Sequence, residues 1–475
     1  MVVNSVKHRI QKLFSDKRLV TFRTVEIPLG RKKIEKVFNE VEKPKSEKLN
    51  LCVKFKNQDG AQSDSFLKNL DMYRSPLQLI LVCFCVTQVP SSASAYNNFQ
   101  VEYEWSYLNF TWRSIHQYAS ALNNGAYIPQ NIVPAGLKIY KRNLYLSLPK
   151  IRRGVPVTLA YIPMGTGDSQ KKNKLLRPFP NWEINDSKNC SNLQSVHSME
   201  IDTNGIMWVL DGMRLGDNTR CPPKLVFLDL NHNGFLVYSY VFANSVSLQD
   251  GGFLNDIVID ESDGGFAYIT DNSNVDPGLV VYSRRRNRAW KLRDRTMFPE
   301  LWAANFFVEN KRFENLVPID GIALSPKSNR NRTVFYCSLT GLNLFSLSAS
   351  VLKDEELCKT DKWRKSVKHV GEKHAQTDGM MMDSTGTLYY TLLPFNGVGN
   401  WNIKEEFVSS RIVEYNRHDM VWPDGFAMDQ EGYLYLISNR IFDYFDQGVQ
   451  LNLTDGVKFR VFKLYTGTKS YLYGQ

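Results

Sequence analysis

The stretch Asp424-Gly425-Phe426-Ala427-Met428-Asp429, followed by Gly432 and Leu434-Tyr435-Leu436, decides the fold because its pattern recurs along the chain. Similar copies begin at His197, Asn255, Asp320 and Asp378, and a degenerate copy runs from Pro134 to Tyr140. Each copy reads as two short apolar strands joined by a polar, Gly-containing turn, which is typical of a β-hairpin. The copies lie about 45 to 65 residues apart, a spacing typical of radial or solenoidal arrays.

One such hairpin cannot bury its own faces, whereas six copies that close into a ring can. A β-propeller is the all-β way to do this, so the sequence predicts an all-β, six-bladed β-propeller. Residues 457–464 alternate polar and apolar side chains. We expect this last strand to complete a blade that begins near the mature N-terminus, because open sheet edges invite pairing with other chains.

The charge of the chain is concentrated at its N-terminal end. The 475 residues carry a net charge of +11, yet residues 1–71 alone hold 16 Lys/Arg against 9 Asp/Glu. With Arg74 included, about +3 remains for residues 96–475. The globular part is therefore nearly balanced, and no nucleic-acid partner is expected.

A secretory signal peptide is expected at residues 72–95. Arg74 precedes an apolar run at residues 76–86, and Ala93-Ser94-Ala95 supplies the small residues of a cleavage site after Ala95. The run is too short to span a bilayer, which takes about 20 residues, so no membrane contact is expected after cleavage. The alternative is a buried core strand.

The internal position of this signal indicates that translation can start at Met72. Residues 1–71 are then an upstream extension that is Lys-rich and poorly periodic, and we expect it to be disordered. A real basic arm is the alternative. The mature protein would cover residues 96–475 as one propeller domain.

Cysteines and acceptor sequons agree with secretion into an oxidising compartment. Four cysteines remain after residue 95, which allows three pairings, and Cys190–Cys221 with Cys337–Cys358 is favoured because each pair flanks one repeat. N-glycosylation sequons begin at Asn109, Asn185, Asn189, Asn331 and Asn452.

The repeats place polar residues at one equivalent position, just before the first strand of each hairpin. These residues are His197, Asn255, Asp320, Asp378 and Asp424. A propeller brings such positions around its central channel, and Asn439, which follows the last repeat's second strand, is a further candidate. The ring of polar groups suits a cation, an amine or a substrate whose proton must move. Three crowded Asp repel one another, so at least one is expected to stay protonated near neutral pH. The alternative interpretation is structural, because an Asp before Gly accepts backbone N–H bonds and shapes a turn.

Motif scans for other chemistry are empty. The chain has no Walker loop, no G-x-S-x-G, no H-E-x-x-H and no Cys/His spacing for zinc. Neither a metal nor a cofactor is expected.

From Val101 to about Thr466 the chain resembles the insect Yellow and major royal jelly protein family. The segments that carry the resemblance, in order, are residues 105–112, 127–131, 154–160, 178–182, 221–226, 320–326 and 438–440. The resemblance implies a six-bladed propeller and a secreted insect protein tied to pigmentation, cuticle or development. Some members are associated with dopachrome conversion in melanin formation, some salivary relatives bind biogenic amines, and royal jelly members are nutritive. Residues 1–71 depart from the family pattern.

The sequence therefore leaves three alternative functions open. The first is a secreted, extracellular binding protein that holds a small aromatic amine or catechol in its channel at His197, Asn255, Asp320, Asp378, Asp424 and Asn439. The second is a dopachrome-converting isomerase of melanin synthesis, and the third is a structural or nutritive glycoprotein without chemistry. The fold is compatible with all three, because function lies in the site.

Overall fold

The computed structural model describes residues 98–473 except 166–170, 216–218, 220, 328–330, 416 and 447–451, together with the backbone of four strands between residues 25 and 66. The chain divides into two compact units, Met1–Ala95 and Tyr96–Gln475. The expected signal peptide and its cleavage site lie outside the described residues.

The first unit contains one antiparallel sheet in the order β1-β2-β3-β4. Its strands are β1 (Val25–Leu29), β2 (Lys32–Lys36), β3 (Cys52–Lys56) and β4 (Gln62–Phe66). The structure thus places strands in part of the segment that the sequence predicts to be disordered. The rest of residues 1–71 lies outside the described residues.

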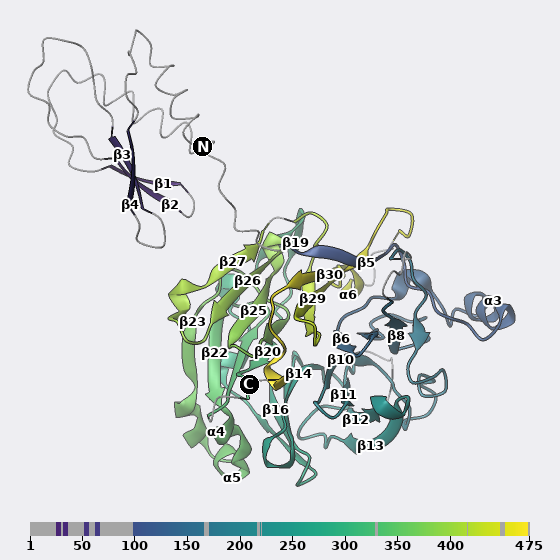
Figure 1. Cartoon of the computed structure of the whole chain (residues 1–475). Helices are drawn as coiled ribbons and strands as arrows, with labels where there is room; N and C mark the ends of the chain where they lie inside the picture. Colours follow the sequence, from purple (N-terminus) through teal and green to yellow (C-terminus); the bar gives the residue numbers. More distant parts are fainter. Residues whose placement is uncertain are drawn as a thin grey trace, which may run out of the picture. The chain divides into compact units, whose positions relative to one another are not determined.

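The second unit is a ring of six four-stranded antiparallel sheets, so the predicted six-bladed β-propeller is confirmed (Figure 1). Blade 1 holds β6 (Leu137–Tyr140), β7 (Asn143–Ser147), β8 (Leu159–Pro163) and β9 (Arg177–Pro178). Blade 2 holds β10 (Val196–Ile201), β11 (Ile206–Asp211), β12 (Lys224–Asp229) and β13 (Phe235–Val241). Blade 3 holds β14 (Leu254–Asp260), β15 (Phe266–Asp271), β16 (Gly278–Ser283) and β17 (Arg288–Leu292).

The remaining blades follow the same order from the inner strand outward. Blade 4 holds β20 (Ile319–Leu324), β21 (Thr333–Ser338), β22 (Asn343–Ser348) and β23 (Lys368–Glu372). Blade 5 holds β24 (Met380–Met382), β25 (Thr387–Leu392), β26 (Gly397–Asn402) and β27 (Arg411–Glu414). Blade 6 holds β28 (Pro423–Met428), β29 (Tyr433–Ser438), β30 (Phe459–Tyr465) and β5 (Gln100–Trp105). A separate hairpin of β18 (Phe306–Val308) and β19 (Lys311–Phe313) lies between blades 3 and 4 in the sequence.

The ring is closed by its two chain ends, as the sequence predicts. The late strand β30 pairs antiparallel with the early strand β5, and Val461 lies opposite Tyr103 (Figure 1). Helices are short and lie between strands: α3 (Ile115–Asn123), α4 (Ala349–Lys353), α5 (Glu355–Cys358) and α6 (Phe442–Phe445).

Glycines hold the inner strands of neighbouring blades close together. A Cβ on Gly379 would lie 2.2 Å from the carbonyl oxygen of Asp424, and one on Gly321 would lie 2.5 Å from that of Asp378. Both distances are too short for any side chain. In the Asp320-Gly321 and Asp378-Gly379 pairs the Gly is therefore required for close backbone approach, whereas a Cβ on Gly425 would find its nearest atom at 3.4 Å.

The first predicted disulfide is present, and the second prediction is wrong. Cys190 and Cys221 are bonded, with their Cα atoms 5.3 Å apart. Cys337 and Cys358 are free. Cys337 is buried at the inner end of β21, beside Gly321. Cys358 lies at the end of α5, between β22 and β23 in the sequence. Its thiol contacts the carbonyl oxygen of Val351. Flanking the same repeat does not bring two cysteines to the same part of a blade.

Burial separates the five predicted glycosylation sites. Asn189, Asn331 and Asn452 are exposed and Asn109 is half-buried. Asn185 is only 1% exposed, and its amide bonds the backbone at four positions, two as acceptor and two as donor. We therefore remove Asn185 from the predicted acceptors, because a glycan there would break all four bonds in this fold.

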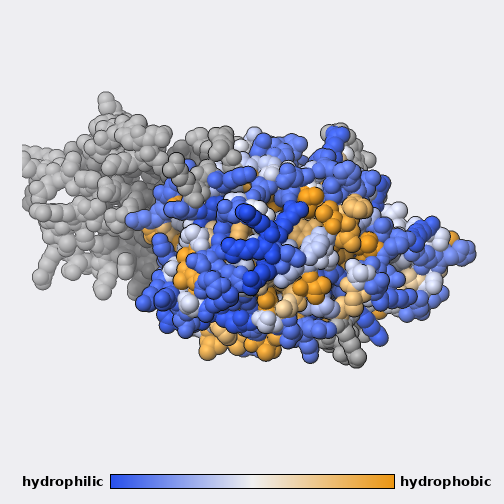
Figure 2. Space-filling view, turned by 90° about the horizontal axis from the view of Figure 1, so that it is seen from below, coloured by the Kyte–Doolittle hydropathy of each residue, from blue (hydrophilic) through white to orange (hydrophobic). Residues whose placement is uncertain are grey.

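The face of the molecule in Figure 2 is mostly hydrophilic, with hydrophobic side chains in separate patches. Among the described residues, no helix is long and apolar enough to cross a membrane.

Candidate binding site at the channel mouth

The structure brings five of the six predicted polar residues into one hydrogen-bonded chain. Side-chain hydrogen bonds join Asp378 to both Asp320 and Asp424. At one end the Nδ2 of Asn255 donates to Oδ1 of Asp320 (2.9 Å), and at the other the Nδ2 of Asn439 donates to Oδ2 of Asp424 (2.5 Å). We call Asp320, Asp378 and Asp424 the carboxyl chain.

All members of the carboxyl chain are buried, each with at most 8% exposure. Burial raises the pKa of Asp378 to about 6, although hydrogen bonds from Trp422 and Asp320 oppose the rise. Burial, followed by the charge of Asp378, raises the pKa of Asp320 and of Asp424 well above the usual range. Near neutral pH the carboxyl chain therefore holds one negative charge, on Asp378. The neutral carboxylic acids of Asp320 and Asp424 donate hydrogen bonds to it.

His197 does not join this chain, although the repeat places it at the equivalent position. Its ring meets the ring of Phe253 edge-on, with centroids 4.9 Å apart. Its Nδ1 is buried and has no hydrogen-bond partner among the described residues. Burial lowers the pKa of His197 to about 3, so the imidazole is neutral. Pro134 of the degenerate copy joins the hydrogen-bonded residues through its backbone. Its carbonyl oxygen accepts from Nδ2 of Asn439 (2.8 Å).

An aromatic layer, made of Phe306, Phe313, Trp422 and Phe442, lies against the carboxyl chain. Its central ring is Trp422, whose Nε1 donates to Oδ2 of Asp378 (2.7 Å). The Trp422 ring lies 5.2 Å from Phe313 and 5.1 Å from Phe442 between centroids. Trp422 adopts a left-handed backbone with φ of 52°, which is costly for a bulky residue and is found where surrounding structure enforces it.

Ion pairs hold the hairpin that contributes Phe306 and Phe313 to this layer. Lys311 on β19 pairs with Asp443 of α6. Arg440 pairs with Glu309 in the hairpin turn (2.7 Å) and with Asp443 (3.2 Å). The hairpin is thereby fixed to blade 6 over the buried acids.

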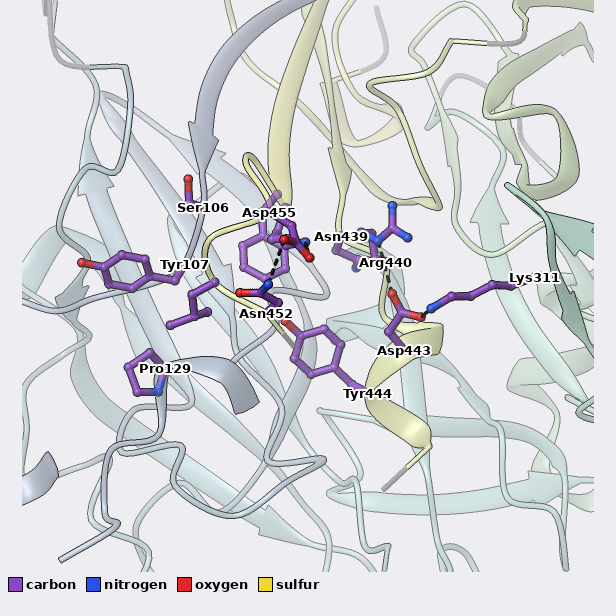
Figure 3. Close-up of a pocket in the computed structure, with 13 residues that line it drawn as sticks. Ser106, Tyr107, Pro129, Lys311, Asn439, Arg440, Asp443, Tyr444, Asn452 and Asp455 are labelled. Carbon is purple, nitrogen blue, oxygen red and sulfur yellow. Dashed lines mark hydrogen bonds and ion pairs between the residues drawn. The ribbon is translucent and has the colours of Figure 1, made fainter. Parts of the chain in front are cut away.

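Beside this layer lies a cavity of about 200 Å³, which we call the rim pocket. Tyr107, Asn439, Arg440, Tyr444, Lys458 and Phe459 are among the residues that line it. Figure 3 shows the ring of Tyr444 between Asp443 and Asn452, with Asn439 and Arg440 at the far side. Asn439 is fully buried and also bonds Asp424, so it is the one described residue that both lines the rim pocket and contacts the carboxyl chain.

A second cluster of buried polar residues lies on the inner strands, and the sequence analysis did not predict it. Lys138 of β6 donates to the carbonyl of Phe426 (3.1 Å) and pairs with Glu200 of β10 (3.5 Å). Tyr471, near the chain end, donates to Glu200 (3.3 Å). Burial raises the pKa of Glu200 and of the neighbouring Asp256, and Lys138 opposes both rises. The signal was present, because Lys138 and Glu200 are charged residues inside apolar strands.

This arrangement can bind and exchange protons. Among the residues that the structure describes, no group of three or more His, Cys, Asp or Glu is placed to hold a metal ion. A buried carboxylate beside aromatic rings complements an organic cation with an aromatic body. A carboxylate with a pKa near 6 beside a neutral carboxylic acid can also take a proton from one atom and return one to another.

These features define a class, a six-bladed propeller with a buried carboxyl chain across the innermost strands of three neighbouring blades. The sequence profile of the family described as "Major royal jelly protein" matches residues 194–466, more than half of the chain. The chain therefore belongs to the major royal jelly protein family, which also contains relatives named "Protein yellow".

Two relatives illustrate the match. "Dopaminechrome tautomerase" of Drosophila melanogaster is 26% identical over 363 residues, which cover 72% of this chain and 77% of that protein. "Protein yellow" of Drosophila madeirensis is 28% identical over 382 residues, which cover 76% of this chain and 65% of that protein.

Among solved structures, virginiamycin B lyase from Staphylococcus aureus covers 78% of this chain and 99% of its own, at 12% identity and a TM-score of 0.39. That likeness is too distant to bear on function.

Proposed function

We propose that this protein is a secreted member of its family that binds a small aromatic amine or catechol derivative at the channel mouth, in insect pigmentation or cuticle formation. The observation that carries the proposal is the single buried negative charge on Asp378, held between two neutral acids and beneath Trp422. An ammonium group pairs with that charge, and aromatic side chains near the carboxyl chain pack against the rest of the ligand.

The relatives support the same chemical class. The name of the tautomerase refers to dopaminechrome, which is a bicyclic quinone formed from an aromatic amine. Secretion is supported by the signal-like segment at residues 72–95 and by the Cys190–Cys221 disulfide, because such bonds persist in oxidising compartments.

Calorimetric titration with dopamine, serotonin and octopamine tests the binding proposal. We expect at least one of them to bind the wild-type protein and to bind Asp378→Asn at least tenfold more weakly. Asp383→Asn is the matched control, because Asp383 is as deeply buried in the same repeat but bonds only its own turn. No binding by the wild-type protein would overturn the proposal.

A second candidate is dopaminechrome conversion, which the mixed protonation of the carboxyl chain favours. Asp378 would take a proton from a ring carbon of the quinone, and Asp424 would give its proton to a quinone oxygen. Transfer of the first proton from Asp378 to Asp424 along their hydrogen bond then restores both groups, and the product is an isomer of the substrate.

The loss of dopaminechrome absorbance over time tests this second candidate directly. If it is correct, wild-type protein accelerates the loss over the uncatalysed rate, and Asp424→Asn, which cannot donate a carboxylic proton, reduces the acceleration by about 10²-fold or more. A wild-type rate equal to the uncatalysed one would leave the binding function alone.

A further inference from the structure

We propose that the rim pocket is the subsite for the oxygen-bearing aromatic ring of the ligand, with Lys458 as the donor to the ring oxygens. Asn439 then lies between the ring and Asp424. This inference rests on the proposed function and narrows it, because it selects a catechol or its quinone over an aromatic amine that lacks ring oxygens.

The size of the rim pocket fits one aromatic ring with short substituents. Its volume is about 200 Å³. A cavity of about 150 Å³ lined by apolar side chains is enough to hold benzene. Tyr444 and Phe459, both nearly fully buried, give the pocket aromatic walls with ring centroids 6.4 Å apart. Tyr107 adds a ring that is 37% exposed.

The charges of the rim pocket select oxygen atoms rather than a second ammonium group. Three cations line it, Lys311, Arg440 and Lys458, against the two carboxylates of Asp443 and Asp455. A further positive charge would meet a net positive wall. A phenol or quinone oxygen instead accepts hydrogen bonds from these cations.

Among the three cations, Lys458 has the most donor capacity to spare. Arg440 bonds both Glu309 and Asp443, and Lys311 pairs with Asp443. Lys458 has one described ion pair, to Asp455, at 3.9 Å. An ammonium group has three N–H donors, so Lys458 can donate to a ring oxygen of the ligand without breaking a close ion pair.

The floor of the rim pocket connects it to the carboxyl chain. Asn439 has its amide on Asp424 and its Oδ1 on the backbone N–H of Ile441 (2.9 Å). The next residue, Arg440, adopts a left-handed backbone with φ of 58°. Such strain persists only where the surroundings impose it, and here it sets Asn439 and Arg440 on adjoining walls of one cavity. A ligand amine that displaces the Asn439 amide enters the carboxyl chain at Asp424, which is hydrogen-bonded to the charged Asp378, while its ring stays in the rim pocket.

Titration calorimetry under nitrogen with three probes separates the two subsites. Dopamine carries both the amine and the ring oxygens, 4-methylcatechol lacks the amine, and phenethylamine lacks the oxygens. We expect Lys458→Ala to weaken dopamine and 4-methylcatechol at least tenfold and to leave phenethylamine unchanged. We expect Asp378→Asn to weaken dopamine and phenethylamine and to leave 4-methylcatechol unchanged.

Lys463→Ala is the matched control, because Lys463 lies on β30 close by in sequence, has a side chain as exposed as that of Lys458 (25% against 22%) and does not line the rim pocket. Tyr107→Ala is a second variant at an exposed wall and should weaken 4-methylcatechol binding without lowering the melting temperature.

Equal affinities of Lys458→Ala and Lys463→Ala for 4-methylcatechol would overturn the inference and leave the proposed amine site unaffected. An effect of Lys458→Ala without any effect of Asp378→Asn would overturn the amine site and support the rim pocket. Binding of none of the probes to wild-type protein would overturn both.

Discussion

Two positions of the repeat hold an acidic residue in several copies, and the structure uses them differently. The channel position holds Asp320, Asp378 and Asp424, whose described carboxylate bonds all come from side chains. Five residues later, the turn position holds Asp202, Asp260, Asp383 and Asp429, whose Oδ1 atoms accept backbone N–H groups of the hairpin turn. The structural interpretation of a repeated Asp therefore applies to the turn position.

The comparison shows that the same residue type serves stability in one place and leaves chemistry available in another. The turn position supplies acceptors for backbone N–H groups and so fixes the hairpin turn. The channel position has no such duty, because the adjacent glycines provide the close contact between blades. Its carboxyl groups include the charged Asp378, which is the group that the proposed ligand amine requires.

The largest expected effect comes from breaking the turn position. In Asp383→Ala, the backbone N–H groups of Thr385 and Thr387 and the Thr385 hydroxyl lose their shared acceptor. Each bond to the carboxylate contributes about 1 kcal/mol, so we expect the free energy of unfolding to fall by about 3 kcal/mol. Chemical denaturation measures this. Ligand affinity of the folded fraction should stay at the wild-type value, and a loss of affinity without a loss of stability would reverse our assignment of the two positions.

The same change at the channel position should act on the ligand instead. In Asp378→Asn the amide oxygen can still accept from Trp422, so we expect stability to change by no more than about 1 kcal/mol. Loss of the charge should weaken dopamine by about 10- to 150-fold, which corresponds to about 1.5–3 kcal/mol. Calorimetric titration and thermal melting of the same preparation measure both quantities. A variant that melts far below wild type would place Asp378 with the turn residues.

The sequence predicts what the repeat controls and misses what the loops add. The six blades, the closing strand and the meeting of Asp320, Asp378 and Asp424 all follow from one repeated pattern. The rim pocket could not be predicted, because Tyr107 and Lys458 come from segments outside the repeat and meet only after the ring closes. A sequon carries no information on burial, which is why Asn185 was predicted wrongly.

A third prediction sharpens the comparison through pH. The pKa of about 6 at Asp378 means that the group is mostly ionised at pH 7.5 and about one-tenth ionised at pH 5. Dopamine keeps its ammonium charge at both values, so we expect its affinity to fall about tenfold between them. Titrations at the two pH values measure the ratio. In Asp378→Asn the ratio should approach one, and an unchanged ratio in that variant would assign the titration to another group.

The smallest expected effect concerns His197, which lies outside the carboxyl chain. Burial lowers the pKa of His197 to about 3, below the value of 6.5 for an unperturbed imidazole. The unfolded chain therefore binds a proton below pH 6.5 that the folded chain does not. The contribution of His197 to stability is fully present above pH 6.5 and is lost as the pH falls toward 3.

At pH 5.5 the loss is about 1 kcal/mol, so His197→Gln should lose less stability than wild type between pH 7.5 and 5.5, by about 2 °C in melting temperature. Other groups titrate equally in both proteins, so the difference isolates His197. His116→Gln is the control for the substitution itself, because His116 is exposed on α3. If His197→Gln and wild type lose the same number of degrees, the pKa of His197 is not lowered by burial in the folded protein.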